Sequence, residues 1–556
     1  MVVRNKNLAV LQAQQNQQQL NKDKLLQIAE NRASIHDFIN NHAANGKSKE
    51  YQKLRKKTLR EINYLLSTEK IKEIDVLISY LSQSFECGNS SYIACYVDDS
   101  WRRSMGLPTS GTLKYSLLYG LPVSFGDSIS IKDYDSCLGL WKYASKKAKS
   151  DSLIVECIKN MGGVPFIKSS TSQGSIALNC QNPIVGKLEP DRFQNYITNS
   201  DGFIVSKDIS PIHLSVDLFG SIRISSAIYR VCGLKPTSNR VSTKGIKKHL
   251  NFLGVPTSLG IISKSIGNLT DFMRSILVDD FFSLDKSLAP IIFNEEKYKV
   301  TPEKCLKIGF FTSFPGSIQT VPSIKRGIEM AVKIFRDSGH KVENFESVAL
   351  DNILELFISL LMADDGSSIQ KLFRDEPIES YNNDLTKNLV YPKIMRKSID
   401  FNSNDKFLSL FWQLAESSKS HTELLDSLTE FKNTFEKDMS LYDALICPVL
   451  PIPLIQKDIS TIGQILLSSY TALYNILDLP AGVITIDSVT ANDIELSRQS
   501  SEEFRWHKDN LNEFLNQIQC NQSLPLSVQI VSHKYHDERV LGLMGLLESN
   551  LLKNSD

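Results

Sequence analysis

The sequence predicts an α/β fold, because segments of strand character and helix character alternate along it. Residues 122–125 (PVSF) and 164–167 (VPFI) have the apolar composition of buried strands. Between them, residues 151–162 carry apolar side chains at helical spacing and end at the pair Gly162–Gly163. A strand, a helix and a strand in this order are typical of a sheet with crossover connections.

The alternation recurs in the second half of the chain. Residues 306–311 read as a strand, 323–336 as an amphipathic helix that ends before Gly339, and 341–345 as a further strand. The N-terminal residues 1–75 are polar and helix-prone. Apolar residues at helical spacing within 71–99 predict a helix that covers a core.

Composition excludes several classes of protein. A net charge of +1 argues against a nucleic-acid-binding protein, and a hydrophobic content of 42% is enough for a sizeable core. The nine cysteines lack metal-ligand spacing, so we expect reduced thiols and neither a metal nor a cofactor. No apolar run reaches the roughly 20 residues of a membrane span, and no secretory signal follows Met1. We therefore expect a cytoplasmic protein with at most peripheral membrane contact.

One motif has the features that acyl transfer requires. Residues 217–223 (DLFGSIR) place Ser221 after a glycine in a segment with little bulk, followed by VCGLKPT at 231–237. A serine in such a turn has its hydroxyl beside backbone N–H groups that can receive an oxyanion. Taken alone the pattern is weak, because Gly-Ser turns are common in loops.

The motif resembles the signature of the amidase signature family, and the flanking sequence is similar to animal fatty acid amide hydrolases. The supporting stretches are residues 118–124 (LYGLPVS), 134–140 (YDSCLGL) and 470–483 (YTALYNILDLPAGV). The resemblance implies one large mixed, twisted sheet wrapped by helices. It divides the chain into a helical N-terminal extension (1–75), an amidase signature domain (76–545) and a C-terminal tail (546–556).

The resemblance also assigns roles to individual residues. It implies that Ser221 is the candidate nucleophile and that its neighbours Leu218, Phe219 and Gly220 form the oxyanion-hole loop. By the same resemblance, Ser175 and Ile176 line an acyl channel.

The rest of the family's catalytic machinery departs from the pattern. Gly126 occupies the position of the catalytic lysine, and the position of the bridging serine, counted back from Ser221, falls on Ile197. If the register of residues 187–205 slides, Thr198 or Ser200 stands in for that serine. Phe219 replaces a glycine of the nucleophile loop. Loss of a general base costs roughly 10²–10⁴ in rate.

Other residues are weaker candidates for a base. Lys132 and Lys168 lie near the strands of the expected site, although a solvated lysine is the commoner case. His213, eight residues before Ser221, would form a Ser–His pair supported by Asp217.

Three functional hypotheses follow. The first is a catalytically degenerate fatty acid amide hydrolase-like protein that binds a fatty acyl amide or another apolar small molecule. The second is an active serine amidase or esterase with a rebuilt triad, and the third is a structural subunit that dimerises through the family's interface. The resemblance adds peripheral membrane docking through the apolar stripe from Phe407 to Leu414, for which packing into the core is the favoured alternative.

Overall fold

The computed structural model describes most of the chain. The residues outside the description are 1, 44–46, 88–89, 108–110, 179–181, 183, 185–198, 248–249, 251, 302, 315–317, 380–405, 416–419, 456–458, 500–522 and 554–556. Among the described residues, no helix has the length and apolar character needed to span a membrane.

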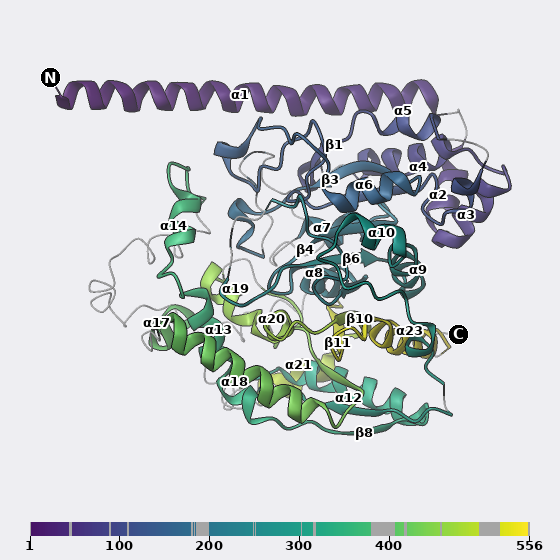
Figure 1. Ribbon diagram of the computed structural model, residues 1–556, viewed down its shortest axis with the longest axis vertical. Coiled ribbons are helices and arrows are strands. Elements are labelled where there is room, and N and C mark those ends of the chain that lie inside the picture. Colours follow the sequence, from purple (N-terminus) through teal and green to yellow (C-terminus); the bar gives the residue numbers. More distant parts are fainter. Residues whose placement is uncertain are drawn as a thin grey trace.

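A mixed sheet of eleven strands forms the centre of the molecule (Figure 1). In their order across the sheet, the strands are β1 (Ile93–Tyr96), β3 (Val164–Ser169), β2 (Pro122–Phe125), β4 (Ile212–Asp217), β6 (Ser258–Ser263), β5 (Cys232–Lys235), β10 (Ala481–Ser488), β11 (Pro525–Ser532), β9 (Ala444–Pro448), β7 (Lys307–Phe310) and β8 (Lys341–Asn344). Strand β2 pairs in parallel with β3 and β4, and β7 pairs in parallel with β8 and β9. The other pairings are antiparallel.

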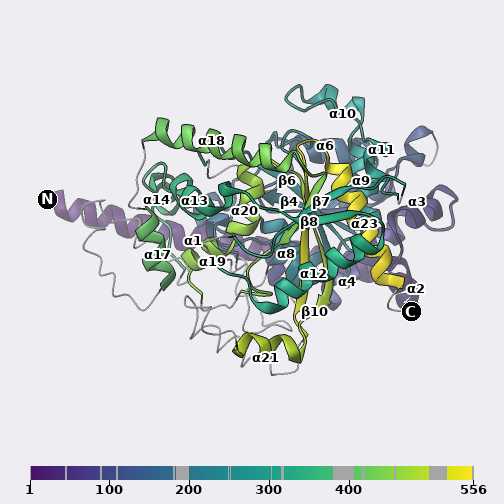
Figure 2. The same cartoon turned by 90° about the horizontal axis from the view of Figure 1, so that it is seen from below.

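Helices surround the sheet, as Figure 2 shows from a second direction. They are α1 (Val2–His42), α2 (Ser48–Arg55), α3 (Leu59–Ser67), α4 (Glu73–Glu86), α5 (Ser100–Met105), α6 (Leu153–Asn160), α7 (Ser200–Ser206), α8 (Ser221–Tyr229), α9 (Ile266–Ile276), α10 (Asp279–Leu284), α11 (Glu295–Tyr298), α12 (Pro322–Asp337), α13 (Ile353–Leu361), α14 (Ser367–Phe373), α17 (Lys406–Ala415), α18 (His421–Met439), α19 (Thr461–Leu467), α20 (Ser469–Ile476), α21 (Ala491–Gln499) and α23 (Asp537–Lys553).

Two glycines show how closely helices approach both faces of the sheet. A Cβ at Gly233 of β5 would lie 2.2 Å from Ser226 Oγ of α8, and one at Gly482 of β10 would lie 2.1 Å from Met544 Sδ of α23. Gly233 pairs with Val483, so the adjacent Gly482 points to the opposite face. Helices α8 and α23 therefore cover opposite faces, and only residues without a side chain allow this spacing.

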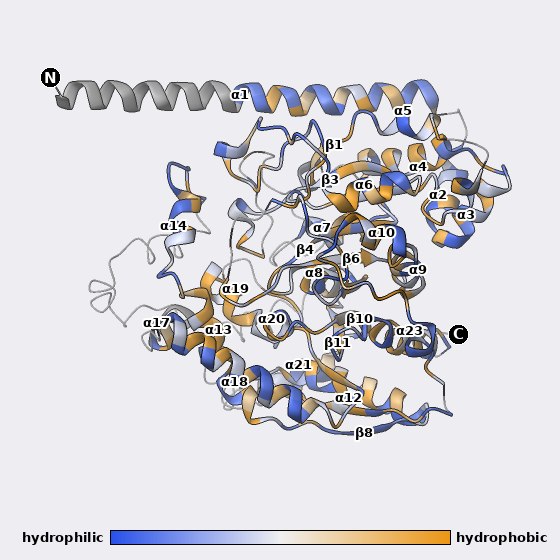
Figure 3. Cartoon of the chain, in the orientation of Figure 1, coloured by the Kyte–Doolittle hydropathy of each residue, from blue (hydrophilic) through white to orange (hydrophobic). Residues whose placement is uncertain are grey.

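The predicted alternation of strands and helices is confirmed with small changes at the ends. The strands expected at 122–125, 164–167, 306–311 and 341–345 are β2, β3, β7 and β8, and the helices expected at 151–162 and 323–336 are α6 and α12. The residues of β2 and β3 are all buried, whereas the edge strand β8 is mostly hydrophilic (Figure 3). The crossover from β2 through α6 to the parallel strand β3 is the predicted strand–helix–strand unit.

The helical pattern read from the sequence across residues 71–99 extends further than the helix in the structure. Helix α4 ends at Glu86, and Ile93–Tyr96 form the edge strand β1, which pairs antiparallel with β3. Four residues are too short a segment for the helical and strand periods to be distinguished. The limits drawn from sequence at 75/76 and 545/546 fall inside α4 and α23, so neither coincides with the end of an element.

The apolar stripe from Phe407 to Leu414 belongs to α17. Phe411 and Trp412 are buried among the core residues and pack edge-to-face with ring centroids 5.2 Å apart. For these two side chains the structure favours packing into the core. The side chains of Phe407 and Leu408 lie outside the description.

Candidate functional site

Ser221 is the first residue of α8, directly after the turn that leaves β4. Gly220 precedes it with φ of +102°, and a Cβ at this position would lie 2.1 Å from Thr471 Oγ1. The left-handed conformation and the contact both require glycine. The Thr471 hydroxyl in turn donates to the carbonyl of Phe219 at 2.8 Å, which fixes the turn from the opposite side.

A buried ion pair holds the base of this turn. The carboxylate of Asp217 accepts a hydrogen bond from the backbone N–H of Gly220 at 2.8 Å and two from the guanidinium of Arg223, each at 3.0 Å. Burial opposes ionisation of Asp217, but Arg223 outweighs it, so the pKa of Asp217 lies below its ordinary value. Asp217 therefore stabilises the turn and does not pair with His213 as the sequence hypothesis proposed.

The hydroxyl of Ser221 faces the pocket without a base beside it. Its Oγ donates to the backbone carbonyl of Val216 at 2.7 Å. Among the described residues, no side chain forms a hydrogen bond with it. A serine that donates to a carbonyl keeps its proton and is a poor nucleophile.

Another residue occupies the space into which a side chain at position 126 would extend. Gly126 follows β2, is buried, and donates its N–H to the carbonyl of Leu214 at 2.7 Å. A Cβ on Gly126 would lie 2.2 Å from Ser215 Oγ and 2.8 Å from Ser215 Cβ. The hydroxymethyl group of Ser215 thus fills the space into which a longer side chain at 126 would project.

A polar network that the sequence analysis did not anticipate lies beside Gly126. His213 Nδ1 is 2.8 Å from Ser124 Oγ, and His213 Nε2 is 2.9 Å from the carboxylate of Asp201. The hydroxyl of Ser169 donates to the same carboxylate at 2.7 Å. Burial opposes ionisation of Asp201, but His213 and the hydroxyls outweigh it and lower the pKa of Asp201.

A signal for this network was present in the sequence. His213 and Ser215 alternate with apolar residues in the buried strand β4, and alternate residues of a strand share one face. Two polar side chains on one buried face require partners. Their partner Asp201 lies on α7 and reaches them only through the tertiary fold, so spacing alone could not identify it.

None of the proposed substitute bases contacts Ser221. Lys132 is exposed. Lys168 is fully buried, and its ammonium donates to the carbonyl of Asp135 at 2.8 Å and to Ser136 Oγ at 2.9 Å. His213 bonds to Ser124 and Asp201.

The candidate positions for the bridging serine are only partly described. Ile197 and Thr198 lie outside the described residues. Ser200 is fully buried as the first residue of α7. Its neighbours Asn199 and Asp201 both line the pocket.

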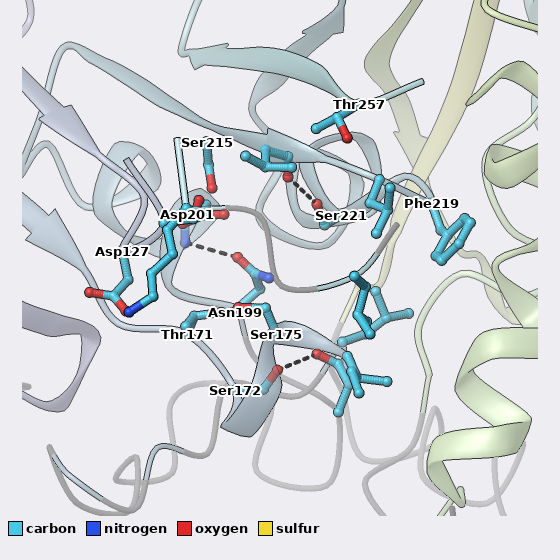
Figure 4. A pocket seen from close by; sticks show the side chains of 18 of the residues that line it. Asp127, Thr171, Ser172, Ser175, Asn199, Asp201, Ser215, Phe219, Ser221 and Thr257 are labelled. Carbon is cyan, nitrogen blue, oxygen red and sulfur yellow. Dashed lines mark hydrogen bonds between the residues drawn. The ribbon is translucent and has the colours of Figure 1, made fainter. Parts of the chain in front are cut away.

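The pocket beside Ser221 has a polar and an apolar part (Figure 4). Its space, including the open mouth, is about 1170 Å³. The figure shows Asp127, Thr171 and Asn199 on one side and Phe219 on the other. Phe219 packs against Phe252 and Phe357, with ring centroids 4.6 and 5.1 Å away. The remaining apolar wall includes Ile176, Leu250, Leu361, Ile369 and Ile465.

The residues expected to form the oxyanion-hole loop and the channel are brought together here. Leu218, Phe219 and Ser221 line the pocket, and Ser175 and Ile176 lie in its wall. The N–H of Gly220 is bound to Asp217. Within the described part of the chain, no three His, Cys, Asp or Glu side chains cluster as a metal site requires.

Comparison with known proteins agrees with this architecture. Residues 75–541 match the model of the Amidase family. The chain is 28% identical to "Fatty-acid amide hydrolase 1" of Sus scrofa over 486 residues, which cover 85% of this chain and 82% of the relative. It is 30% identical to "Vitamin D3 hydroxylase-associated protein" of Gallus gallus over 328 residues, covering 56% and 68%.

A solved structure shares the fold. The structure "Fatty acid amide hydrolase" superposes with a TM-score of 0.73 and 17% identity, covering 95% of this chain and 90% of that one. The mixed sheet wrapped by helices, the DLFGSIR turn and the family match over 75–541 lead to the same conclusion. This chain belongs to the amidase family and is similar to fatty acid amide hydrolases.

Proposed function

We propose that this chain is a fatty acid amide hydrolase-like protein that no longer hydrolyses amides and that binds an apolar, acyl-chain-bearing small molecule in the pocket beside Ser221. The observation that carries this proposal is the filled space at Gly126. A lysine base there would have to enter space held by Ser215 Oγ, which lies 2.2 Å from the position of a Cβ.

The state of Ser221 supports the same proposal. Its hydroxyl donates to the Val216 carbonyl, and Lys168 and His213 are held by other partners. Nucleophilic catalysis by serine requires a base within hydrogen-bond reach. The pocket itself is retained, with its apolar wall of Ile176, Leu250 and neighbouring side chains.

The first test is hydrolysis of oleamide by the wild-type protein and by Ser221→Ala. We expect equal, background rates and no labelling of the wild type by a fluorophosphonate, since labelling requires an activated serine. Turnover or labelling that disappears in Ser221→Ala would support the alternative, an active serine amidase with a rebuilt triad, and would overturn the loss of catalysis.

The second test is binding of decanoate and decanamide by isothermal titration calorimetry below the concentration of micelle formation. We expect saturable binding of at least one of them. Ile176→Glu places a charge on the apolar wall and should weaken binding, whereas Ile292→Glu, at an exposed position, should not. If neither compound binds, the proposal that the pocket still accepts an acyl chain is wrong.

Two further expectations stay predictions from the resemblance. They are a homodimer and peripheral membrane contact of a cytoplasmic protein. The burial of Phe411 and Trp412 supports core packing of α17 over docking through these two side chains.

A further inference from the structure

A charged cluster of three lysines and two aspartates reaches the pocket. Its members are Lys24 of α1, Lys168 of β3, Lys247, Asp127 and Asp135, of which Asp127 and Lys247 line the pocket. Four of the five are almost completely buried, so their charges have little help from water. The ion pairs between these lysines and aspartates determine which lysine has no carboxylate partner and can bind an anionic ligand.

Two of the lysines are matched by the two carboxylates. Lys24 Nζ lies 2.6 Å from Asp135, and Lys168 Nζ lies 3.7 Å from Asp127. Burial opposes ionisation of Asp127 and outweighs the attraction of Lys168, so the pKa of Asp127 is raised. Asp127 is thus paired with Lys168, and its charge reaches Lys247 only from beyond 4.0 Å.

Lys247 is the remaining lysine and the one of the three that lines the pocket. Its ammonium donates to the carbonyl of Ser136 at 2.8 Å and lies 3.5 Å from the ring centroid of Tyr143. Among the described residues, no carboxylate oxygen lies within 4.0 Å of this ammonium. Both close partners are uncharged, so Lys247 is a partly buried cation with no carboxylate paired to it.

Asn199 provides a second donor on the same pocket. Its Oδ1 accepts from the backbone N–H of Asp201 at 2.8 Å and from Ser225 Oγ at 3.0 Å. These two bonds fix the orientation of the amide. Its Nδ2 has no hydrogen-bond acceptor among the described residues, and Figure 4 shows the side chain inside the pocket.

Asp201, the other carboxylate that lines the pocket, already has hydrogen-bond donors of its own. Asp201 accepts hydrogen bonds from Ser169 and His213, and the hydroxyl of Ser215 also contributes to the low pKa of Asp201. With its oxygens satisfied in this way, Asp201 is poorly suited to bind a ligand cation.

We propose that the pocket selects a single-chain carboxylate over the neutral amide, with the carboxylate at Lys247 and Asn199 and the chain along the wall of Phe219 and Leu361. The inference rests on the proposed function, because it concerns the same pocket. The ligand class is that of the acid that amide hydrolysis releases, not of the amide itself. A charge-assisted hydrogen bond in a partly buried site is the physical basis of this preference.

The experiment compares decanoate, decanamide and decylamine by isothermal titration calorimetry at pH 7.5. We expect decanoate to bind about tenfold or more tightly than decanamide, the gain of one charge-assisted bond over a neutral one. Decylamine should bind most weakly. If decanamide binds and decanoate is no tighter, this inference fails while the proposed function stands; if neither compound binds, the proposed function fails.

Substitutions test which residue causes the preference for decanoate over decanamide. Lys247→Met should remove the difference between decanoate and decanamide, and Lys247→Arg should retain most of it. The matched control Lys244→Met removes an exposed lysine three residues away and should leave the difference unchanged. A preference that survives Lys247→Met would place the carboxylate elsewhere and overturn the assignment.

A second variant keeps the test decisive if Lys247→Met does not fold. Asn199→Asp preserves an oxygen that can cap α7 and replaces the donor Nδ2 by a carboxylate oxygen. It should weaken decanoate binding several-fold and decanamide binding clearly less. Equal effects on both ligands would contradict a carboxylate site at Asn199.

Discussion

At the scale of the residue, the close approach of Ser215 to Gly126 makes the introduction of a lysine at 126 depend on a second position. Gly126→Lys alone should destabilise the protein by about 1–3 kcal/mol, the usual cost of overpacking a core. Ser215→Gly removes the hydroxymethyl group that a Cβ at 126 would meet at 2.2 Å. The double variant should therefore be more stable than Gly126→Lys, as measured by urea unfolding.

Activity should follow the same order. Oleamide hydrolysis should be absent from Gly126→Lys and weak at best in Gly126→Lys/Ser215→Gly/Ile197→Ser, in which a base and a bridging hydroxyl are both present. Ser215→Gly alone serves as the control for the lost hydroxyl. If Gly126→Lys is as stable as the wild type, Ser215 moves aside at little cost and the space is not closed.

At the scale of the element, α1 is attached to the rest of the molecule by a buried ion pair. Lys24 is 5% exposed, and its ammonium contacts both oxygens of Asp135, at 2.7 and 2.6 Å. Burial would lower the pKa of Lys24, but Asp135 outweighs it and the pKa is raised. The backbone N–H of Ser145 also binds this carboxylate, so the pair joins α1 to the loop after β2.

Lys24→Met should lower the free energy of unfolding by about 3–5 kcal/mol, because it leaves the Asp135 carboxylate buried without its cation. Lys24→Met/Asp135→Leu should be less destabilised than the single variant, since neither charge is left unpaired. Lys22→Met, at an exposed position of the same helix, is the matched control. Urea unfolding of the four proteins measures the effect, and equal stability of Lys24→Met and Lys22→Met would rule out a structural role for the pair.

The same scale shows what sequence could predict. The β2–α6–β3 unit and the α12 region were predictable because α6 and α12 are long enough to show the helical period, and the apolar strands β2 and β3 are bounded by Pro122, Gly126 and Gly163. Strand β1 was missed because its four residues are too few to show the strand period, although Gly88 and Asn89 separate them from α4 in the sequence. In the site, the sequence shows a glycine at the position that the family resemblance assigns to lysine. That Ser215 fills the space beside it depends on the register between β2 and β4.

At the scale of the whole molecule, several buried carboxylates couple stability to pH. Burial opposes the ionisation of Asp201, Asp217 and Asp478, but their cationic and hydroxyl partners outweigh it and their pKa values are lowered. A carboxyl with a lower pKa in the folded state binds protons preferentially when unfolded. Its contribution to the free energy of unfolding is therefore complete above about pH 5. This contribution is lost as the pH falls through the unfolded-state pKa of about 3.9 toward the lower pKa of the folded state.

The free energy of unfolding should accordingly decrease as the pH falls below about 5. Asp478→Asn should reduce the slope on this acid side by up to about 1.4 kcal/mol per pH unit, the value for one proton. The amide can still accept the hydrogen bond from the backbone N–H of Ser238. Asp279→Asn removes an exposed carboxylate and is the control. Urea unfolding at a series of pH values tests this, and a wild-type slope in Asp478→Asn would contradict the assignment.

The contact between Ser215 and the Cβ direction of Gly126 also has an evolutionary consequence. In a lineage whose ancestor carried lysine at 126, that lysine and the present conformation of Ser215 could not have coexisted. The lysine must have been lost before, or together with, the arrival of a serine in this conformation. Once the serine was in place, a single reverse mutation at 126 would have met a folding penalty before it could restore any activity, so selection would have had no one-step return to the ancestral enzyme.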